Sequence, residues 1–203
     1  MFLIGLTGGI AAGKTTVAKR LVELGAVEID ADILSRKAVE RGSDGLRQVV
    51  ATFGVSVLND SGDLNRQALA EIIFSNPEKR ELLESIVHPI VRLLAQNALD
   101  EQAADSIVVY SVPLLVEATV DLPFDIVVSV EAPQSAQIER MMKTRNMTRQ
   151  QAEQRIGVQA SPAQRANRAD IILNSNQSLG RMIDDVDALW QDILRRAAKK
   201  QGE

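Results

Sequence analysis

The sequence predicts an α/β fold in which helices cover both faces of a five-stranded parallel sheet. Two observations carry this prediction: short apolar runs alternate with helical patterns, and a glycine-rich turn joins the first apolar run to the first helix. Alternation of strand and helix is typical of parallel sheets, because each crossover helix must lie on a face of the sheet. The length of 203 residues and the ordinary hydrophobic share of 45% fit one globular unit, residues 1–203, and argue against disorder.

The predicted strands are short and apolar, as buried parallel strands are. They cover residues 2–6, 26–30, 106–112, 124–130 and 169–174. The first helix is predicted for residues 14–24, because Val17, Leu21 and their apolar neighbours recur at helical spacing before a stop at Gly25. The last helix is predicted for residues 179–199, with Ser178 as its cap.

Two segments depart from this simple alternation. Residues 32–105 carry mostly helical patterns, far more than one crossover needs, so we expect a helical insertion that binds the substrate. Within it, Pro89 predicts a helix start near His88. The predicted core is then made of residues 1–31, 106–140 and 169–203.

The second departure is the arginine-rich segment, residues 140–168. It holds seven basic side chains in all, and Glu153 is the one acid after Arg140. Thr148 with Gln151, and Ser161 with Gln164, predict two capped helices in it. We expect residues 141–168 to form a lid that closes over a nucleotide and brings guanidinium groups to its phosphates.

A phosphate-binding turn follows the first strand. GLTGGIAAGKTT contains the Walker A pattern G-x-x-x-x-G-K-[ST] from Gly8 to Thr15, and it opens a helix, as this pattern requires. Small residues let backbone N–H groups wrap a polyphosphate, Lys14 would reach the β- and γ-phosphates, and Thr15 would ligate Mg²⁺. The residues expected to hold ATP are Gly8, Gly9, Ala11, Ala12, Gly13, Lys14, Thr15 and Thr16, with Arg145 from the lid.

Other classes of protein fit less well. The chain has no guanine-reading N/T-K-x-D stretch, and no acid follows the strand at 106–112 as a motor ATPase would require. It has no cysteine and one histidine, which disfavours catalytic zinc. A net charge of −4 disfavours nucleic acid as a partner, and no apolar run approaches the length of a membrane span. We expect a cytoplasmic, monomeric small-molecule kinase.

Phosphoryl transfer also needs an oriented acceptor hydroxyl and positive charge. Asp30 and Asp32 end the second predicted strand, at the sheet edge where ligands bind in such folds. We expect Asp32 to accept or orient the hydroxyl proton, and Asp30 to be structural or near the metal; the alternative is that Asp32 caps the next helix. Arg140 and Arg145 are the preferred lid arginines, with Arg140 on the transferring group, although arginines on solvated helix faces are common.

Ten stretches occur in a specific order: GLTGGIAAGKTTVA, LGAVEIDAD, FG (53–54), SGDLNR, HP, VPLLVE, QIER, TR, GVQA and ADIILNS. Over nearly the whole chain this order resembles the dephospho-coenzyme A kinase family. The resemblance implies ATP-dependent phosphorylation of the ribose 3′-hydroxyl of dephospho-coenzyme A, the last step of coenzyme A synthesis, with Asp32 as the catalytic base. The residues then expected near the substrate are Asp32, Arg66, His88, Leu114 and Leu115, with a local structural role as the alternative for Arg66 and His88.

The sequence departs from the family pattern at several positions. Ala11, Ala12 and Thr15 stand where the family loop commonly has Gly, Ser and Ser. A positive φ at Ala11 would cost roughly 1 kcal/mol. Ser111 stands where many relatives carry an acid, which weakens the case for a metal carboxylate there. Two alternatives stay open: a kinase for another small hydroxyl or nucleoside monophosphate, and a nucleotide-sensing module without turnover.

Overall fold

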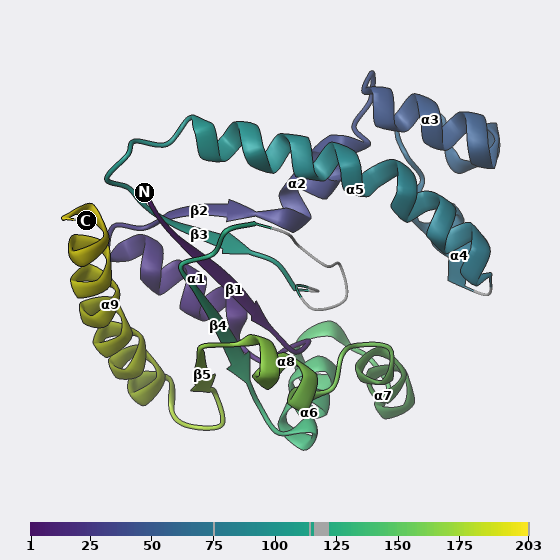
Figure 1. Cartoon of the computed structure of the whole chain (residues 1–203). Coiled ribbons are helices and arrows are strands. Elements are labelled where there is room, and N and C mark those ends of the chain that lie inside the picture. The colour runs from purple at the N-terminus through teal and green to yellow at the C-terminus, as the bar shows by residue number, and fades with distance from the viewer. Residues whose placement is uncertain (75, 114, 116–121, 203) are drawn as a thin grey trace. The chain divides into compact units, whose positions relative to one another are not determined.

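In the computed structural model, which describes residues 1–74, 76–113, 115 and 122–202, five strands form a single sheet (Figure 1). The strands are β1 (Phe2–Gly8), β2 (Val27–Asp30), β3 (Ile107–Ser111), β4 (Ile126–Glu131) and β5 (Ile171–Asn174). Their order is β2-β3-β1-β4-β5, and β1 pairs in parallel with both β3 and β4. The predicted five-stranded parallel sheet of an α/β, P-loop-type fold is confirmed.

Helices of very different length connect and extend this sheet. They are α1 (Lys14–Glu23), α2 (Ala31–Ala38), α3 (Asp44–Phe53), the 3₁₀ turn η1 (Val55–Val57), α4 (Arg66–Phe74), α5 (Pro77–Asp100), α6 (Gln134–Arg145), α7 (Arg149–Gly157), α8 (Pro162–Arg168) and α9 (Leu179–Gln201). Within the described residues, none of these helices has both the length and the apolarity needed to cross a bilayer.

The main core lies between the sheet and helices α1 and α9. All seven residues of β1 are buried, as expected for the central strand of a parallel sheet. From α9, an apolar stripe that includes Val186, Trp190 and Ile193 packs with Val17 and Leu21 of α1 against this sheet. Ser178 caps α9 as predicted, because its side chain accepts a hydrogen bond from the N–H of Arg181.

An ion pair on the protein surface joins α1 to α9. The Arg20 guanidinium donates to both carboxylate oxygens of Asp187, at 2.7 and 2.8 Å. This hydrogen bonding lowers the pKa of Asp187 below the ordinary value for an aspartate. It also raises the pKa of Arg20 above the ordinary value for an arginine.

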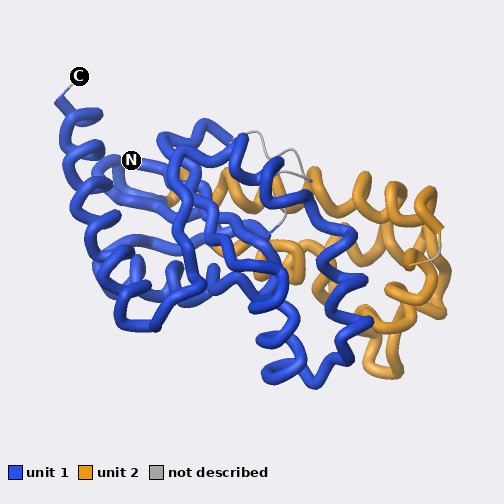
Figure 2. The backbone as a smooth tube through the Cα atoms, turned by 90° about the horizontal axis from the view of Figure 1, so that it is seen from below, with its two compact units in different colours: residues 1–29, 102–203 blue, residues 30–101 orange. Residues whose placement is uncertain are grey.

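The chain divides into two compact units, which Figure 2 shows in different colours. Unit 1 contains residues 1–29 and 102–203, with the sheet, α1 and α6 to α9. Unit 2 contains residues 30–101, with helices α2 to α5. Unit 2 has its own small apolar core, built around Val39, Val49, Val57 and Leu69.

The predicted helix start at His88 is wrong. His88 and Pro89 lie inside α5, which begins at Pro77, eleven residues before His88. The side chain of Asn76 caps this helix by accepting a hydrogen bond from the N–H of Lys79 at 3.0 Å. Both prolines can open a helix, but only Pro77 is preceded by a residue whose side chain can cap one.

The arginine-rich segment, residues 140–168, folds as the end of α6 followed by α7 and α8. Both predicted capping boxes are present, with Thr148 and Gln151 opening α7, and Ser161 and Gln164 opening α8. A small apolar cluster centred on Met141 ties α6 to α7. It also includes Ile10 and Ala11, which belong to the turn after β1.

Candidate functional site

The glycine-rich turn between β1 and α1 requires small residues at defined places. A Cβ on Gly8 would lie 2.4 Å from the carbonyl oxygen of Val130 on β4, so the neighbouring strand leaves no space for a side chain. Gly13 is the N-cap of α1 and has a φ of 102°, a conformation that favours glycine. The first residue of α1 is therefore Lys14, directly after the turn.

The start of α1 carries backbone donors that the protein itself does not use. Among the described residues, the N–H groups of Gly13, Lys14 and Thr15 have no hydrogen-bond acceptor, and no side chain caps the helix. Unpaired N–H groups at the positive end of a helix dipole favour the binding of an anion. The turn thus offers three backbone donors to phosphate oxygens.

The Lys14 side chain reaches strand β3. Its Nζ donates to the Oγ of Ser111 at 2.5 Å, and Ser111 is completely buried at the end of that strand. Because the partner is a hydroxyl and not a carboxylate, no negative charge at this position competes with a phosphate for Lys14. The departure at Ser111 noted in the sequence therefore changes the environment of this lysine directly.

Ala11 adopts the left-handed conformation considered from the sequence, with a φ of 56°. Two contacts with α6 offset the cost of this conformation. Its methyl group belongs to the apolar cluster with Ile138 and Met141, and its carbonyl accepts a hydrogen bond from Arg140 Nη1 at 3.1 Å. Arg140 also donates to the hydroxyl and the carbonyl of Ser175, which follows β5, at 3.0 and 2.6 Å.

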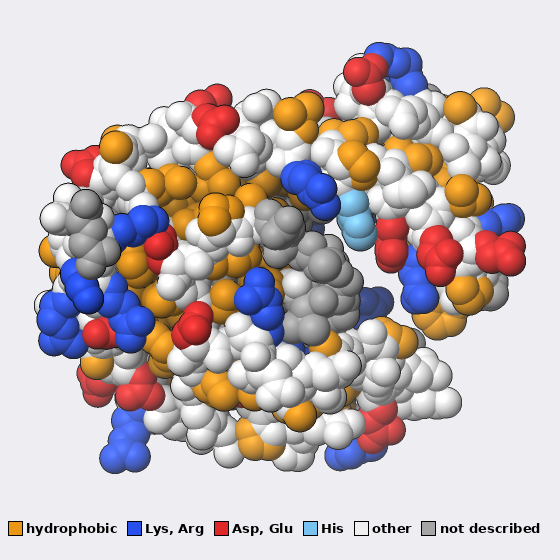
Figure 3. Space-filling view, in the orientation of Figure 1, with side chains coloured by type: hydrophobic (Ala, Val, Ile, Leu, Met, Phe, Trp, Pro, Cys, Tyr) orange, Lys and Arg blue, Asp and Glu red, His pale blue; other side chains and the backbone are white. Residues whose placement is uncertain are grey.

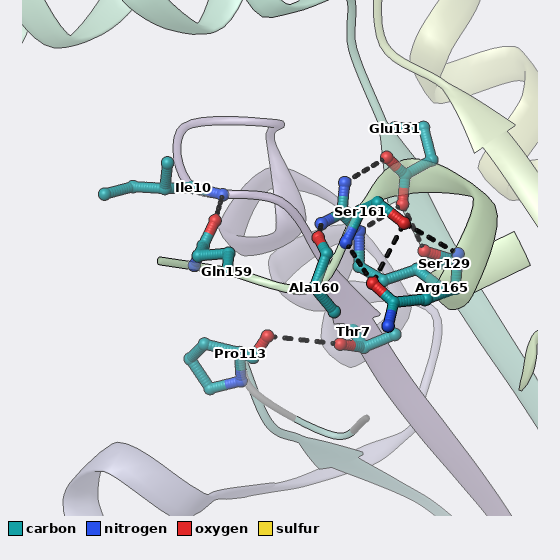
Figure 4. A network of polar contacts seen from close by, with 10 residues as sticks. Thr7, Ile10, Pro113, Ser129, Glu131, Gln159, Ala160, Ser161 and Arg165 are labelled. Carbon is teal, nitrogen blue, oxygen red and sulfur yellow. Dashed lines mark hydrogen bonds and ion pairs between the residues drawn. The ribbon is translucent and has the colours of Figure 1, made fainter. Parts of the chain in front are cut away.

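A second set of polar contacts surrounds the beginning of the turn (Figure 4). The Arg165 guanidinium forms a bidentate ion pair with the carboxylate of Glu131, the last residue of β4, with N···O distances of 2.7 and 2.6 Å. Arg165 Nη1 also donates to the carbonyl of Ala160 at 2.5 Å. The residue before Ala160, Gln159, accepts a hydrogen bond through its side chain from the N–H of Ile10 at 2.9 Å. These contacts connect the sheet, α8 and the turn.

Buried polar side chains of the described chain gather around this turn. They are Thr7, Ser111, Ser129, Gln137, Arg165 and Ser175. Ser111 and Ser175 bond to Lys14 and Arg140, and Gln137 lies so near Gly9 that a Cβ there would be 2.3 Å from its Nε2. Thr7 directly precedes the turn and donates to the carbonyl of Pro113, and Ser129 donates to Glu131 at 2.6 Å. Buried polar groups are costly unless they are paired, so this concentration marks the turn as the functional centre of unit 1.

The two predicted aspartates have different environments in unit 2. Asp30 is the N-cap of α2, because its Oδ1 accepts a hydrogen bond from the N–H of Asp32 at 2.7 Å. The alternative in which Asp32 caps this helix is therefore wrong. The carboxylate of Asp32 is exposed and has no hydrogen-bond or ion-pair partner among the described residues, so it is free to meet a ligand.

The other predicted site residues are more dispersed. Arg145, in the last turn of α6, is exposed. Arg66, the first residue of α4, and His88 are also exposed; His88 is the chain's one histidine and is coloured pale blue in Figure 3. Leu115 is only 2% exposed and lies beside Gly5 of β1, which favours a packing role. Leu114 lies outside the described residues. Substrate contacts of Arg66, His88, Leu114 and Leu115 stay predictions.

A family model described as dephospho-CoA kinase matches residues 2–180. The chain belongs to this family. It is 44% identical over 197 residues to the dephospho-CoA kinase of Leifsonia xyli subsp. xyli, covering 95% of this chain and 99% of that one. It is 41% identical over 197 residues to that of Streptomyces avermitilis, covering 97% and 96%. The crystal structure of TT1252 from Thermus thermophilus matches with a TM-score of 0.83 and 30% identity, covering 94% of this chain and 97% of that chain.

Family membership confirms the predicted activity: the chain is a kinase that phosphorylates dephospho-CoA. A different acceptor is not favoured, and neither is a sensing module without turnover. The residues that sequence reasoning missed as part of the site are Glu131, Gln137, Gln159 and Ser175. A signal existed for Glu131, since it is an acid at the carboxyl end of an apolar strand, where ligand sites occur in parallel sheets.

Proposed function

We propose that this dephospho-CoA kinase transfers the γ-phosphoryl group of ATP to the ribose 3′-hydroxyl through the turn at residues 8–16 and the carboxylate of Asp32. The observation that carries the proposal is the set of unpaired N–H groups of Gly13, Lys14 and Thr15 at the start of α1. These donors would bind phosphate oxygens, and Lys14 would move from Ser111 to the β- and γ-phosphates. The protein contributes position and positive charge, which are the main needs of phosphoryl transfer.

Mg²⁺ fits this site through Thr15. Its side chain lies in the first turn of α1 and the residue is exposed, and a hydroxyl is one of the oxygen ligands that Mg²⁺ accepts beside ATP phosphates. The described residues contain no cluster of three or more acidic or histidine side chains that could hold the ion alone. Thr15 would hold Mg²⁺ together with the nucleotide, and the ion would supply charge neutralisation at the phosphates.

Asp32 would act on the acceptor. Its carboxylate is unpaired, whereas the neighbouring Asp30 is occupied as a helix cap. An unpaired carboxylate can accept the proton of the 3′-hydroxyl, which makes the oxygen a better nucleophile as the bond to phosphorus forms. The role of unit 2 in binding the rest of the substrate, and the lid role of residues 141–168, are part of the same proposal.

Arg140 and Arg145 have different parts in this proposal. Arg145 is exposed on α6 and can swing toward the phosphates when the lid closes. Arg140 is engaged with Ala11 and Ser175, so contact with the transferring group would require it to give up at least one of these bonds. We therefore expect Arg140 to support the turn in the absence of nucleotide and to bind phosphate only when nucleotide is present.

The proposal is tested by incubating the purified chain with Mg-ATP and dephospho-CoA and measuring ADP and coenzyme A. We expect Asp32→Asn to lower kcat by about 10²- to 10⁴-fold, because a general base is lost. Asp30→Asn is the matched control, since asparagine keeps a cap oxygen for α2. Absence of ADP formation by the wild-type chain, or equal activity of Asp32→Asn and wild type, would contradict the proposal.

A further inference from the structure

We propose that Gln159 is a positioning residue of the phosphate-binding turn, which it holds from outside in the shape that receives ATP. The inference rests on the proposed function, because it concerns the nucleotide site of that reaction. Its basis is the hydrogen bond from the N–H of Ile10 to Gln159 Oε1, at 2.9 Å, between residues 149 positions apart in the sequence. Figure 4 shows the Gln159 side chain directed at the backbone of Ile10.

Side chains of the arginine-rich region hold two peptide groups of the turn, Gly9–Ile10 and Ala11–Ala12, which are separated by one peptide group. Gln159 accepts from the N–H of Ile10, and Arg140 donates to the carbonyl of Ala11. Between these two atoms lies Ala11 itself, in a left-handed conformation that alanine does not favour. Holding the backbone before Ile10 and after Ala11 favours this conformation over the alternatives open to a free loop. The N–H groups of the following residues, Gly13 to Thr15, then have defined positions before ATP binds.

Gln159 is in turn supported by the sheet. The carbonyl of its neighbour Ala160 accepts a hydrogen bond from Arg165, and Arg165 is held by both oxygens of Glu131 at the end of β4. The Arg165 side chain is 5% exposed and that of Glu131 is 15% exposed, so this support is shielded from solvent. The backbone that carries Gln159 is therefore held, so the hydrogen bond to Ile10 has to order only the side chain.

The turn is also closely packed on this side. A Cβ on Gly9 would lie 2.3 Å from Gln137 Nε2 and 3.0 Å from Arg165 Nη2. The peptide that donates the Ile10 N–H thus has side chains against it, and Gln159 supplies the acceptor that this N–H needs. Loss of the acceptor would leave the peptide free to change orientation, and the cost of restoring it would appear when phosphates bind.

This role predicts an effect on nucleotide binding and little effect on chemistry. The bond is made with the turn in its binding shape, so it stabilises the ATP complex and the transition state equally. Gln159→Met keeps the length of the side chain but removes the acceptor. We expect it to raise the Kd of a non-hydrolysable ATP analogue and the KM for ATP by about 3- to 10-fold, the equivalent of one hydrogen bond. We expect kcat at saturating ATP to stay within about twofold, as for loss of uniform binding.

The matched control is Gln151→Met. Gln151 also accepts a backbone hydrogen bond, from Thr148 at 2.9 Å, but only within its own helix cap and without contact to the turn. It therefore reports any general effect of losing a glutamine from the arginine-rich segment. Hydrogen exchange of the Ile10 amide in the complete chain adds a direct reading of the contact, which should be faster in Gln159→Met and unchanged in Gln151→Met.

Binding of the analogue is measured by calorimetry, and it does not depend on which acceptor the enzyme uses. A selective increase of Kd in Gln159→Met, with faster exchange at Ile10, supports the inference. Equal Kd values for the two variants, or a normal exchange rate at Ile10 in Gln159→Met, overturn it. Failure of the wild-type chain to phosphorylate dephospho-CoA would instead contradict the proposed function and leave this binding comparison intact.

Discussion

Removing either charge of the ion pair between Glu131 and Arg165 is expected to destabilise unit 1 strongly. The side chains of Glu131 and Arg165 are 15% and 5% exposed, and they form a bidentate ion pair with N···O distances of 2.7 and 2.6 Å. Glu131 also accepts from Ser129, and Arg165 also donates to Ala160, so the hydrogen-bonding groups of both ions are well used. Replacing only one member of such a pair is strongly destabilising, because the other charged side chain stays buried without its partner.

The expected magnitudes follow from this burial. Glu131→Gln and Arg165→Met should each lower the free energy of unfolding by about 3–5 kcal/mol, the range for breaking a buried pair. The double variant leaves neither charge behind, so its loss should be close to that of one single variant. The resulting coupling energy is about 3–5 kcal/mol, at or above the upper end of the range for directly interacting residues.

Urea unfolding followed by tryptophan fluorescence measures these free energies of unfolding for unit 1, which contains the ion pair. Trp190 is the chain's one tryptophan, and it is 6% exposed in the core of unit 1. The control pair is Arg149 and Glu153, which lie 3.5 Å apart on α7 with side chains 65% and 47% exposed. Its coupling should be about 0.5 kcal/mol or less and should fade in high salt, whereas that of the buried pair should persist.

A coupling energy for Glu131 and Arg165 no larger than that of the control pair would refute this reasoning. It would mean that the Arg165 guanidinium is solvated in solution, and that the chain from Glu131 to Gln159 is not a fixed support. A strong coupling that disappears at high salt would refute it equally, because shielded charges are screened much less than exposed ones.

Three further predictions address the turn, the long helix and the surface ion pair. Ala11→Gly should change the free energy of unfolding by less than about 0.5 kcal/mol, because relief of the left-handed strain is offset by the lost methyl contact and by a more flexible unfolded chain; stabilisation above about 1 kcal/mol in urea unfolding would show that the methyl group contributes no packing. Asn76→Ala should destabilise by about 1 kcal/mol and Pro89→Ala should stabilise by about 1–3 kcal/mol, as measured by circular dichroism, because the first removes a helix cap and the second removes a proline from a helix interior; a destabilising Pro89→Ala would argue for a helix start at that residue. The hydrogen bond from Arg20 holds the pKa of Asp187 low in the folded state, so the pair stabilises the protein above the ordinary carboxylate pKa and this contribution is lost as the pH falls through the lowered value; the difference in thermal midpoint between wild type and Asp187→Asn should therefore shrink between about pH 6 and about pH 3, and a constant difference would contradict the assignment.

The parts of the fold that local chemistry determines could be predicted from the sequence. Each strand was expected within two residues of its observed ends, because an apolar run bounded by glycine or polar residues leaves few options. The two capping boxes of α7 and α8 were predictable for the same reason: all their contacts lie within three residues. The start of α5 was not, because its long pattern holds two prolines and the choice between them depends on the cap at Asn76.

The candidate site divides along the same line. Its inner side, from Gly8 to Thr15, is one continuous motif whose composition follows from the need to expose backbone donors. Its outer side consists of single side chains brought from far along the chain: Gln159 is 149 positions from Ile10, and Arg140 is 129 positions from Ala11. No periodicity or spacing encodes such contacts, since they arise only after the sheet and α6 to α8 have packed.

This division explains why the sequence overstated how many arginines are free to act on phosphate. A count of basic residues between 140 and 168 treats them as equivalent. In the structure Arg165 is buried on Glu131 and Arg140 is bonded to the turn, while Arg145 is exposed. Burial of a guanidinium requires fixed acceptors, and the sheet end and the turn provide them. Of these three arginines, Arg145 is exposed and Arg165 is paired with Glu131, whereas Arg140 would have to give up at least one of its bonds to Ala11 and Ser175 before it could bind phosphate.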